Sequence, residues 1–269
     1  MKRYLKIALL GALVLSFVAA LGCGSKETAN TTGSTSGESA KQEVVYKVGT
    51  DAAYAPFESV DPSSEIIGFD IDVLSAVAAA EDFKVKFINT AWEGIIPSLT
   101  EKKNDILVSA LTITEERKKE VDFSDSYFES TNYIVVAKDS PVASLADLKG
   151  KTVSVQQGTT GDISLTEFLG KDYTGIKRFK GTPEAFLELK NGKVDAAVAD
   201  SGVVMEYVKN NADLNLKYIK DDKFAKENYG IAVRKGETEL LAKINAGLKK
   251  IKDNGEYDKI FEKWFGAKQ

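Results

Sequence analysis

Histidine is absent from this sequence of 269 residues, and cysteine occurs once, as Cys23. The lack of histidine excludes Ser-His and Cys-His nucleophiles, imidazole metal sites and the commonest general base. A single cysteine allows neither an intrachain disulfide nor a zinc site built from thiolates. The net charge is −4, so the chain has no basic excess that would favour nucleic acid. We therefore expect no metal, no cofactor and no nucleic-acid partner.

The longest apolar run lies at the N-terminus and is too short to span a membrane comfortably. Residues 1–6 are basic, residues 7–20 carry no charge, and Leu21-Gly22-Cys23 follows. This layout is typical of a secretory signal. A small residue directly before a lone cysteine resembles the lipobox of bacterial lipoproteins, although Leu21 lies one position closer to the cysteine than usual. We predict a signal peptide at residues 1–22, a lipid on Cys23 and an extracytoplasmic protein anchored to the cell membrane.

Residues 24–43 are mostly small and polar and show no apolar period. Such a segment cannot bury enough apolar surface to offset the entropy lost on ordering. We predict that residues 23–43 form the lipidated cysteine and a flexible tether in front of a folded part.

From residue 44 onward, short apolar runs alternate with stretches of helical period. The predicted strands are 44–48, 85–88, 106–109, 133–137, 152–155, 196–199 and 230–233. Among the helical stretches, Ile71, Leu74 and Val77 share one face, and Asn254-Gly255 separates the last two helices. This alternation predicts an α/β fold with largely parallel sheets. In such sheets, ligands bind beyond the carboxyl ends of the strands.

Polar residues follow two of the early predicted strands. Asp51 and Tyr54 come after the first strand, and Ser109 ends a later one. Thr114 is a predicted helix N-cap, which places Arg117 in the first helical turn, where its charge opposes the helix dipole. A guanidinium group that clamps a carboxylate would offset this cost.

Two segments in the second half of the chain have the same placement. The loop 157–161 contains Thr159 and Thr160 between glycines, and small residues let backbone N–H groups approach an anion. The loop lacks the Lys-Ser/Thr of a phosphate-binding P-loop. Asp200 places a carboxylate at the end of another apolar strand. Taken singly, a residue such as Asp51 or Asp200 is more often part of a turn or a cap, but the joint position of these segments at strand ends favours one binding site.

Several longer motifs occur in order along the mature chain. They are Gly49-Thr50-Asp51, Pro56-Phe57-Glu58, Gly68-Phe69-Asp70-Ile71-Asp72, Ile96-Pro97-Ser98-Leu99, Thr112-Ile113-Thr114-Glu115-Glu116-Arg117, Asp122-Phe123-Ser124 and Lys263-Trp264-Phe265-Gly266. With these motifs, the region from about residue 44 to 265 resembles the polar amino-acid family of periplasmic-type binding proteins. The resemblance implies a type II periplasmic-binding-protein fold, in which two α/β lobes are joined by two hinge strands around a ligand cleft. Lobe 1 would comprise residues 44–131 plus 228–269, and lobe 2 residues 132–227.

The resemblance also implies roles for individual residues. Arg117 would pair with the ligand α-carboxylate, assisted by the Thr112 hydroxyl and by N–H groups of Thr112 and Thr160. Asp200 would receive the α-ammonium group. The other implied ligand contacts are Asp51 near the ligand side chain, Tyr54 and Trp92 as aromatic walls, Gln156 as a variable side-chain contact, and Ser109, Ala110 and Thr159 beside them.

The ligand side chain is less sharply specified. Tyr54 and Trp92 could enclose a guanidinium or ammonium group through cation–π contacts, with Asp51 as the counter-charge. This arrangement favours arginine or another basic amino acid. Glutamine is the alternative, because Asp51 could accept from its amide and Gln156 could complete the hydrogen bonds.

The implied function is capture of a polar amino acid by a monomeric binding protein, which closes about its hinge and delivers the ligand to an ABC importer permease. A remote alternative is a dehydratase of small carboxylates on the same fold, with a glutamate or lysine as its acid. The predicted site offers no spare acid for that role, so we expect no enzymatic activity. The sensor domain of a larger receptor is a third interpretation and would require a separate partner.

Overall fold

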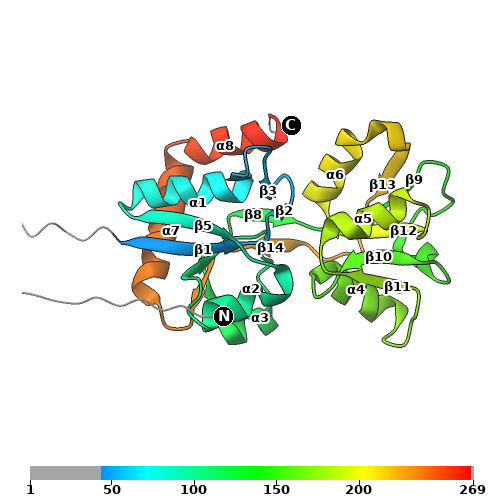
Figure 1. Cartoon of the computed structure of the whole chain (residues 1–269), viewed down its shortest axis with the longest axis horizontal. Coiled ribbons are helices and arrows are strands. Elements are labelled where there is room, and N and C mark those ends of the chain that lie inside the picture. Colours follow the sequence, from blue (N-terminus) through cyan, green and yellow to red (C-terminus); the bar gives the residue numbers. More distant parts are fainter. Residues whose placement is uncertain (1–43, 268–269) are drawn as a thin grey trace, which may run out of the picture. The chain divides into compact units, whose positions relative to one another are not determined.

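The computed structural model describes residues 44–267. The predicted signal peptide, the lipidation site and the predicted tether lie outside the described residues. The described chain forms two α/β lobes, each built on a five-stranded sheet (Figure 1). Within residues 44–267, every helix is too short or too polar to cross a bilayer.

Lobe 1 contains the first sheet, whose strands lie in the order β5 (Lys84–Asn89), β1 (Val45–Thr50), β6 (Ile106–Leu107), β15 (Ala232–Arg234) and β7 (Val121–Phe123). Its helices are α1 (Phe69–Ala80), the 3-10 turn η1 (Trp92–Gly94), α2 (Ile95–Thr100), α3 (Glu115–Glu120), α7 (Thr238–Asp253) and α8 (Glu256–Phe265). A small sheet of β2 (Ala53–Tyr54), β3 (Glu58–Val60) and β4 (Ile66–Ile67) leads into α1. The predicted face of α1 is buried and packs on α7 and α8.

Lobe 2 contains the second sheet, in the order β11 (Ile176–Phe179), β10 (Val153–Gln156), β12 (Ala196–Asp200), β9 (Asn132–Ala137) and β13 (Leu216–Ile219). Its helices are α4 (Thr160–Leu169), α5 (Thr182–Lys190) and α6 (Ser201–Asn210), with 3-10 turns η2 (Leu145–Leu148) and η3 (Ala212–Leu214). Ile134, Val153, Val155 and Leu165 are fully buried in a core of this lobe's own. Each lobe therefore has the apolar interior that a stable unit requires.

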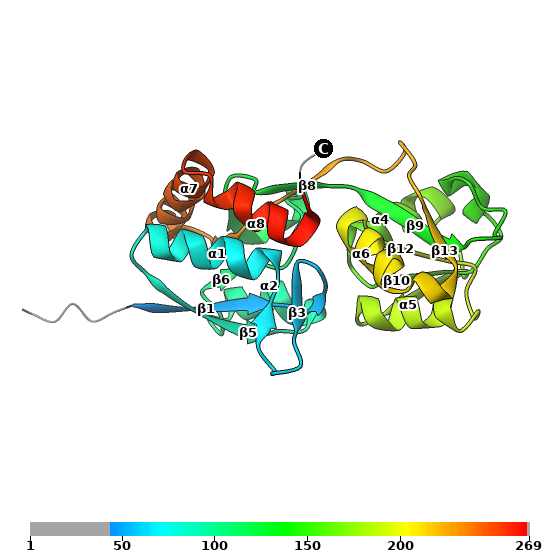
Figure 2. The ribbon, with the colours of Figure 1, turned by 90° about the horizontal axis from the view of Figure 1, so that it is seen from above.

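Two short strands cross between the lobes. They are β8 (Phe128–Ser130) and β14 (Glu227–Tyr229), which pair antiparallel, with Ser130 opposite Glu227. Figure 2 shows the chain passing from β8 into β9 of the other lobe. The two predicted crossings, at about residues 130–133 and 228–230, overlap these strands. The lobe boundaries between residues 131 and 132 and between residues 227 and 228 stay a prediction.

Four of the five strands in each sheet run in the same direction, as the prediction of largely parallel sheets requires, and one strand in each sheet is reversed. In lobe 1, β1 runs parallel to β5 and β6, whereas β15 runs antiparallel to β6 and β7. In lobe 2, β10 runs parallel to β11 and β12, whereas β9 runs antiparallel to β12 and β13. The reversed strands β9 and β15 are those that follow the two crossings. Their direction is set by the path between the lobes, because no crossover helix precedes them.

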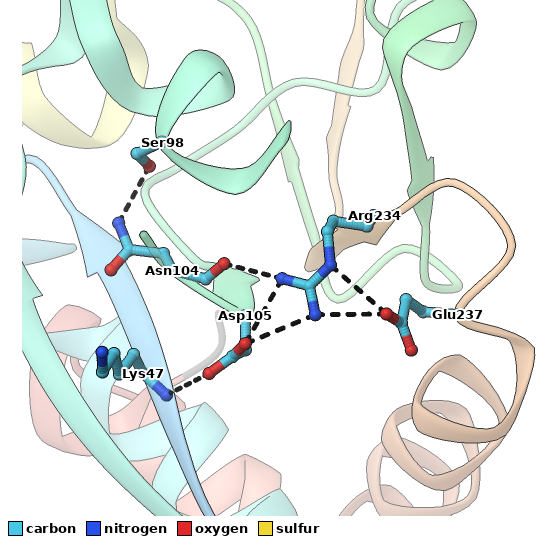
Figure 3. Close-up of polar contacts among 6 residues, drawn as sticks. All are labelled: Lys47, Ser98, Asn104, Asp105, Arg234 and Glu237. Carbon is cyan, nitrogen blue, oxygen red and sulfur yellow. Dashed lines mark hydrogen bonds and ion pairs between the residues drawn. The ribbon is translucent and has the colours of Figure 1, made fainter. Parts of the chain in front are cut away.

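Arg234 joins three segments at the end of the lobe 1 sheet where β6 begins (Figure 3). Its guanidinium donates to Asn104 O at 2.8 Å, to Asp105 Oδ1 at 3.3 Å and to Glu237 Oε1 at 3.1 Å. Asp105 Oδ2 also accepts from Lys47 N–H at 3.0 Å. The Arg234 side chain is only 18% exposed. This network lies opposite the carboxyl ends of β1 and β6, where the predicted site residues lie.

Candidate ligand-binding site

Segments of both lobes line one cavity at the carboxyl ends of the strands. It is lined by Asp51, Tyr54, Glu58, Trp92, Ser109, Ala110, Thr112, Arg117, Gln156, Thr159, Thr160 and Asp200. Every ligand contact predicted from the sequence is among these residues, so the structure brings the predicted set together. Their contact with a ligand stays a prediction. Glu58 lines the cavity but was not predicted as a site residue.

Arg117 is fixed in the cavity wall by contacts to both lobes. The Thr114 side chain accepts from Arg117 N–H at 3.2 Å, which confirms the predicted N-cap of α3. The guanidinium donates to Thr112 O at 2.8 Å and, across the cleft, to Gly158 O at 3.5 Å. It also lies 5.1 Å from the centre of the Trp92 ring. Burial lowers the pKa of Arg117, but an arginine remains cationic, so the cavity wall carries a fixed positive charge.

Asp200 ends β12 and presents its carboxyl group to the same cavity from lobe 2. The Tyr229 hydroxyl, from the hinge strand β14, donates to Asp200 Oδ2. The Asp200 N–H donates to the Tyr54 hydroxyl oxygen at 3.3 Å. Burial, reinforced by the charge of Glu227, raises the pKa of Asp200 to about 7, while Arg117 acts in the opposite direction. A cation placed against this carboxyl group would favour its ionised form.

Asp51 and Gln156 meet across the cleft beside Arg117 and Asp200. Gln156 Nε2 donates to Asp51 Oδ2 at 2.9 Å and to Lys180 O at 3.0 Å, and Gln156 Oε1 accepts from Thr182 Oγ1 at 2.9 Å. These contacts fix the orientation of the amide. Burial raises the pKa of Asp51, and the hydrogen bond from Gln156 counteracts this.

The loop before α4 is held by the cap of that helix. Thr159 accepts from Asp162 N–H at 3.3 Å and donates to Gln156 O at 2.9 Å. Gly158 has a φ of 74°, which favours glycine, and its N–H donates to Asp162 at 3.0 Å. The Thr159 hydroxyl is therefore committed to the helix N-terminus, and the loop turns the Gly158 carbonyl toward Arg117.

Glu227 lies next to the cavity on hinge strand β14 and bonds to both lobes. Its Oε2 accepts from Thr112 Oγ1 at 2.7 Å and Thr160 Oγ1 at 2.8 Å, and its Oε1 accepts from Asn132 Nδ2 at 2.6 Å. A hydroxyl has one proton to donate. The predicted donation from the Thr112 hydroxyl to a ligand carboxylate is therefore absent in this conformation, which leaves Arg117 and backbone N–H groups for that role.

Glu227 was not predicted as a site residue. In the sequence, Glu227 could be recognised only as an acid directly before the second crossing between the lobes. Its partners Thr112 and Thr160 lie 115 and 67 residues away in the sequence.

Glu58 corrects the expectation that the site has no spare acid. Its side chain is fully buried and its Oε1 accepts from the Ser109 hydroxyl at 3.0 Å. The same hydroxyl oxygen accepts from Asp51 N–H at 2.9 Å. Strand β6 ends at Leu107, two residues earlier than predicted, so Ser109 and Ala110 lie in a loop at the cavity. In the sequence, Glu58 stands out only as the last residue of the Pro56-Phe57-Glu58 motif.

The cavity thus combines the cation of Arg117 with the carboxyl groups of Asp51, Glu58 and Asp200. Because Arg117 and Asp200 belong to different lobes, one small zwitterion could pair with both and bridge the lobes. No cluster of side chains suited to a metal ion occurs within residues 44–267.

Comparison with known proteins identifies the family. The model for bacterial extracellular solute-binding proteins, family 3, matches residues 46–267. This chain belongs to that family. The resemblance seen in the sequence and the two-lobed type II fold are both confirmed.

The relatives include proteins named for several amino acids. A probable histidine-binding protein of Neisseria gonorrhoeae is 43% identical over 222 residues, covering 82% of this chain and 83% of the relative. The arginine-, lysine-, histidine-binding protein ArtJ of Geobacillus stearothermophilus is 44% identical with a TM-score of 0.80, covering 85% and 97%. An ancestral arginine-binding protein bound to glutamine is 46% identical with a TM-score of 0.78, covering 83% and 98%. Each of these relatives is described as a binding protein.

Proposed function

We propose that this protein captures a polar L-amino acid in the cavity between its lobes and delivers it to the permease of an ABC importer. One observation carries the proposal: a buried cation, Arg117, and a buried carboxyl group, Asp200, lie on opposite walls of the same cavity. The α-carboxylate of the ligand would bind Arg117 and its α-ammonium would bind Asp200. A ligand that contacts both lobes stabilises the closed state through contacts that an open state lacks.

A basic side chain, as in arginine, is the favoured ligand chemistry. The carboxyl groups of Asp51 and Glu58 line the cavity beyond the pair that would hold the zwitterion. Trp92 and Tyr54 add aromatic surface, and a cation over such a ring gains about 0.5–2 kcal/mol. The names of the histidine-binding relative and of ArtJ agree with this choice.

Glutamine is the alternative ligand. The Gln156 Nε2 group donates to Asp51 and Lys180 O, and Gln156 Oε1 accepts from Thr182 and can accept a second hydrogen bond. The side-chain amide of a glutamine ligand could therefore donate to Gln156 Oε1 and to Asp51. The ancestral relative bound to glutamine supports this option.

A thermal-shift screen against the twenty amino acids tests the function. The purified protein would first be unfolded and refolded to remove any carried ligand. At 100 times its dissociation constant, a ligand adds about 2.7 kcal/mol of stability. We expect selective stabilisation by arginine, lysine or histidine. Stabilisation by glutamine alone would favour the alternative, and no response to any amino acid would refute the proposed ligand class.

We further propose that the protein is a monomer held at the outer face of the cell membrane by a lipid on Cys23. The sequence pattern of residues 1–23 supports this anchoring, and the family consists of extracellular solute-binding proteins. Replacement of Cys23 by alanine should move the protein from the membrane fraction to the soluble fraction. Retention of C23A in membranes that have been washed with carbonate would contradict lipid anchoring.

We propose no catalytic activity. Glu58 is an acid in the cavity, as the dehydratase alternative requires, but function follows the complete site and not one residue. The binding groups described above account for a whole zwitterion, and the relatives compared here are binding proteins. Formation of a new product from a small carboxylate incubated with the protein would overturn this view.

A further inference from the structure

Glu58, which lines the cavity, and Asp70 are held by consecutive residues, because the Ser109 hydroxyl donates to Glu58 and the Ala110 N–H donates to Asp70. Both side chains are fully buried. Glu58 begins β3, and Asp70 lies in the first turn of α1. Gly68 permits their approach, because a Cβ atom at this position would lie 1.9 Å from Phe57 O. The Asp70 N–H then donates to the same carbonyl at 3.0 Å, so the backbone itself brings the two acids together.

One oxygen of each carboxyl group has ordinary hydrogen-bond donors. Glu58 Oε1 accepts from the Ser109 hydroxyl at 3.0 Å. Asp70 Oδ2 accepts from Ala110 N–H and from the Tyr127 hydroxyl, both at 2.6 Å. The other two oxygens, Glu58 Oε2 and Asp70 Oδ1, meet no donor N–H or O–H in the described part of the chain. These two oxygens are therefore the atoms that could bind a proton held between the acids.

A proton between the two acids would give each of these oxygens a hydrogen-bond partner. Ionised carboxylates only accept hydrogen bonds, so one member of a bonded pair must be protonated. Asp70 is the better carrier of the negative charge, because it already accepts two hydrogen bonds and lies at the N-terminus of α1. Glu58, the member that lines the ligand cavity, is therefore the better carrier of the proton.

Within residues 44–267, the hydrogen-bond donors to the pair are the neutral groups of Ser109, Ala110 and Tyr127, and the charge of Asp51 acts on Glu58 in the same direction as burial. Burial raises the pKa of Glu58 well above its ordinary value, and the charge of Asp70 raises it further. Burial also raises the pKa of Asp70 to about 7. A cationic ligand side chain bound beside Glu58 would thus add a positive charge close to these acids.

We propose that Glu58 and Asp70 share one proton, which a cationic ligand side chain bound beside Glu58 displaces to solvent and a neutral side chain leaves in place. This rests on the proposed function and makes Glu58 a residue that distinguishes cationic from neutral ligands. The step balances simply, since protonated protein and cationic ligand give the complex and one free proton. A cation at short range in a dry site stabilises the second negative charge that is otherwise unfavourable beside Asp70.

Arginine and citrulline are matched probes, because they are nearly the same in shape and differ in side-chain charge. Calorimetric titrations at about pH 6, in buffers with different ionisation enthalpies, give the protons released per ligand bound. We expect arginine to release about one proton more than citrulline, and its affinity relative to citrulline to rise toward ~tenfold per pH unit from about pH 5 to 7. Any release from Asp200 cancels in this difference, because both ligands carry the same α-ammonium group. Glutamine serves as the neutral probe if citrulline does not bind.

Two substitutions locate the proton. Glu58→Gln keeps an acceptor for Ser109 but removes the titrating carboxyl group, so the difference between the probes should disappear. Asp51→Asn is the matched control, because it removes the other acid near the ligand side chain and leaves the Glu58–Asp70 pair intact, so the difference should persist.

The wild-type comparison decides the proposal even if a variant fails to fold. Equal proton release by arginine and the neutral probe would overturn it. A difference lost in D51N but kept in E58Q would also overturn it, because the proton would then belong to Asp51. Binding of neutral amino acids without any cationic one would overturn this inference while the amino-acid-binding function stands. Failure of every amino acid to bind would instead overturn the proposed function.

Discussion

Replacement of Arg117 by methionine should separate ligand binding from folding. Methionine fills much of the volume of the aliphatic stem but provides neither charge nor N–H donors. The variant would lose the hydrogen bonds to Thr112 O at 2.8 Å and Gly158 O at 3.5 Å, and the contact with the Trp92 ring at 5.1 Å. It would also lose the cation that we propose for the ligand carboxylate. We expect R117M to fold and to bind its amino acid at least about tenfold more weakly.

The magnitude follows from the charges that line the cavity. Arg117 is the one cationic side chain among the lining residues. A charged hydrogen bond contributes about 1.5–3 kcal/mol, and a buried charge that has lost its partner costs about 3–5 kcal/mol. At 1.4 kcal/mol per tenfold, these values correspond to losses of about 10-fold to beyond 1,000-fold in affinity. The stability of the unliganded protein should change much less, because burial already disfavours the charged form of Arg117.

Titration calorimetry would measure the affinity and denaturant unfolding the stability, with Arg234→Met as the matched control. Arg234 is a partly buried arginine of lobe 1, but its partners Asp105 and Glu237 lie at the opposite end of the sheet. R234M should lose about 1–3 kcal/mol of unfolding free energy and keep its affinity. An R117M affinity within threefold of wild type would refute the role of Arg117. Weakened binding in R234M would show that loss of an arginine acts through the fold.

Three further substitutions test the groups around the cavity. The folded-state pKa of Asp200 is about 7, above its ordinary value of 3.8. The contribution of this carboxyl group to the free energy of unfolding is therefore complete below pH 3.8 and is lost as the pH rises through about 7. Unliganded D200N should therefore gain stability relative to wild type as the pH rises from about 4 to about 7 in denaturant unfolding; a constant difference would contradict the shift. Glu227→Gln removes the charge that raises the pKa of Asp200 after burial itself, so the midpoint of this pH dependence should move to lower pH in the same assay. Gln156→Ala removes the hydrogen bond that lowers the pKa of Asp51, and arginine affinity at about pH 6 should fall by roughly 0.5–1.5 kcal/mol; unchanged calorimetric affinity would argue against a role for this contact.

The sequence predicted the location of the site better than the connections that hold it. Asp51, Ser109 and Asp200 could be placed together because each follows an apolar strand, and strand ends in α/β sheets meet at one edge. The partners of these groups could not be placed in this way. Glu58 is buried because Gly68 approaches Phe57 through tertiary packing, and no local period encodes that contact. The two reversed strands, β9 and β15, could not be predicted for a similar reason, because alternation of strands and helices does not reveal where the chain crosses between lobes.

The contacts across the cleft also indicate where ligand selectivity must arise. Every α-amino acid offers the same carboxylate and ammonium groups, so the proposed contacts with Arg117 and Asp200 would not distinguish one amino acid from another. Arg117 and Asp200 also form hydrogen bonds that join the lobes. Arg117 donates to Gly158 O, and Asp200 N–H donates to the Tyr54 hydroxyl oxygen. Differences in affinity between ligands must therefore come from the remaining lining groups, chiefly the acids Asp51 and Glu58. Because burial raises the pKa of both acids, their protonation, and not only their position, should decide whether a basic or a neutral side chain is preferred at a given pH.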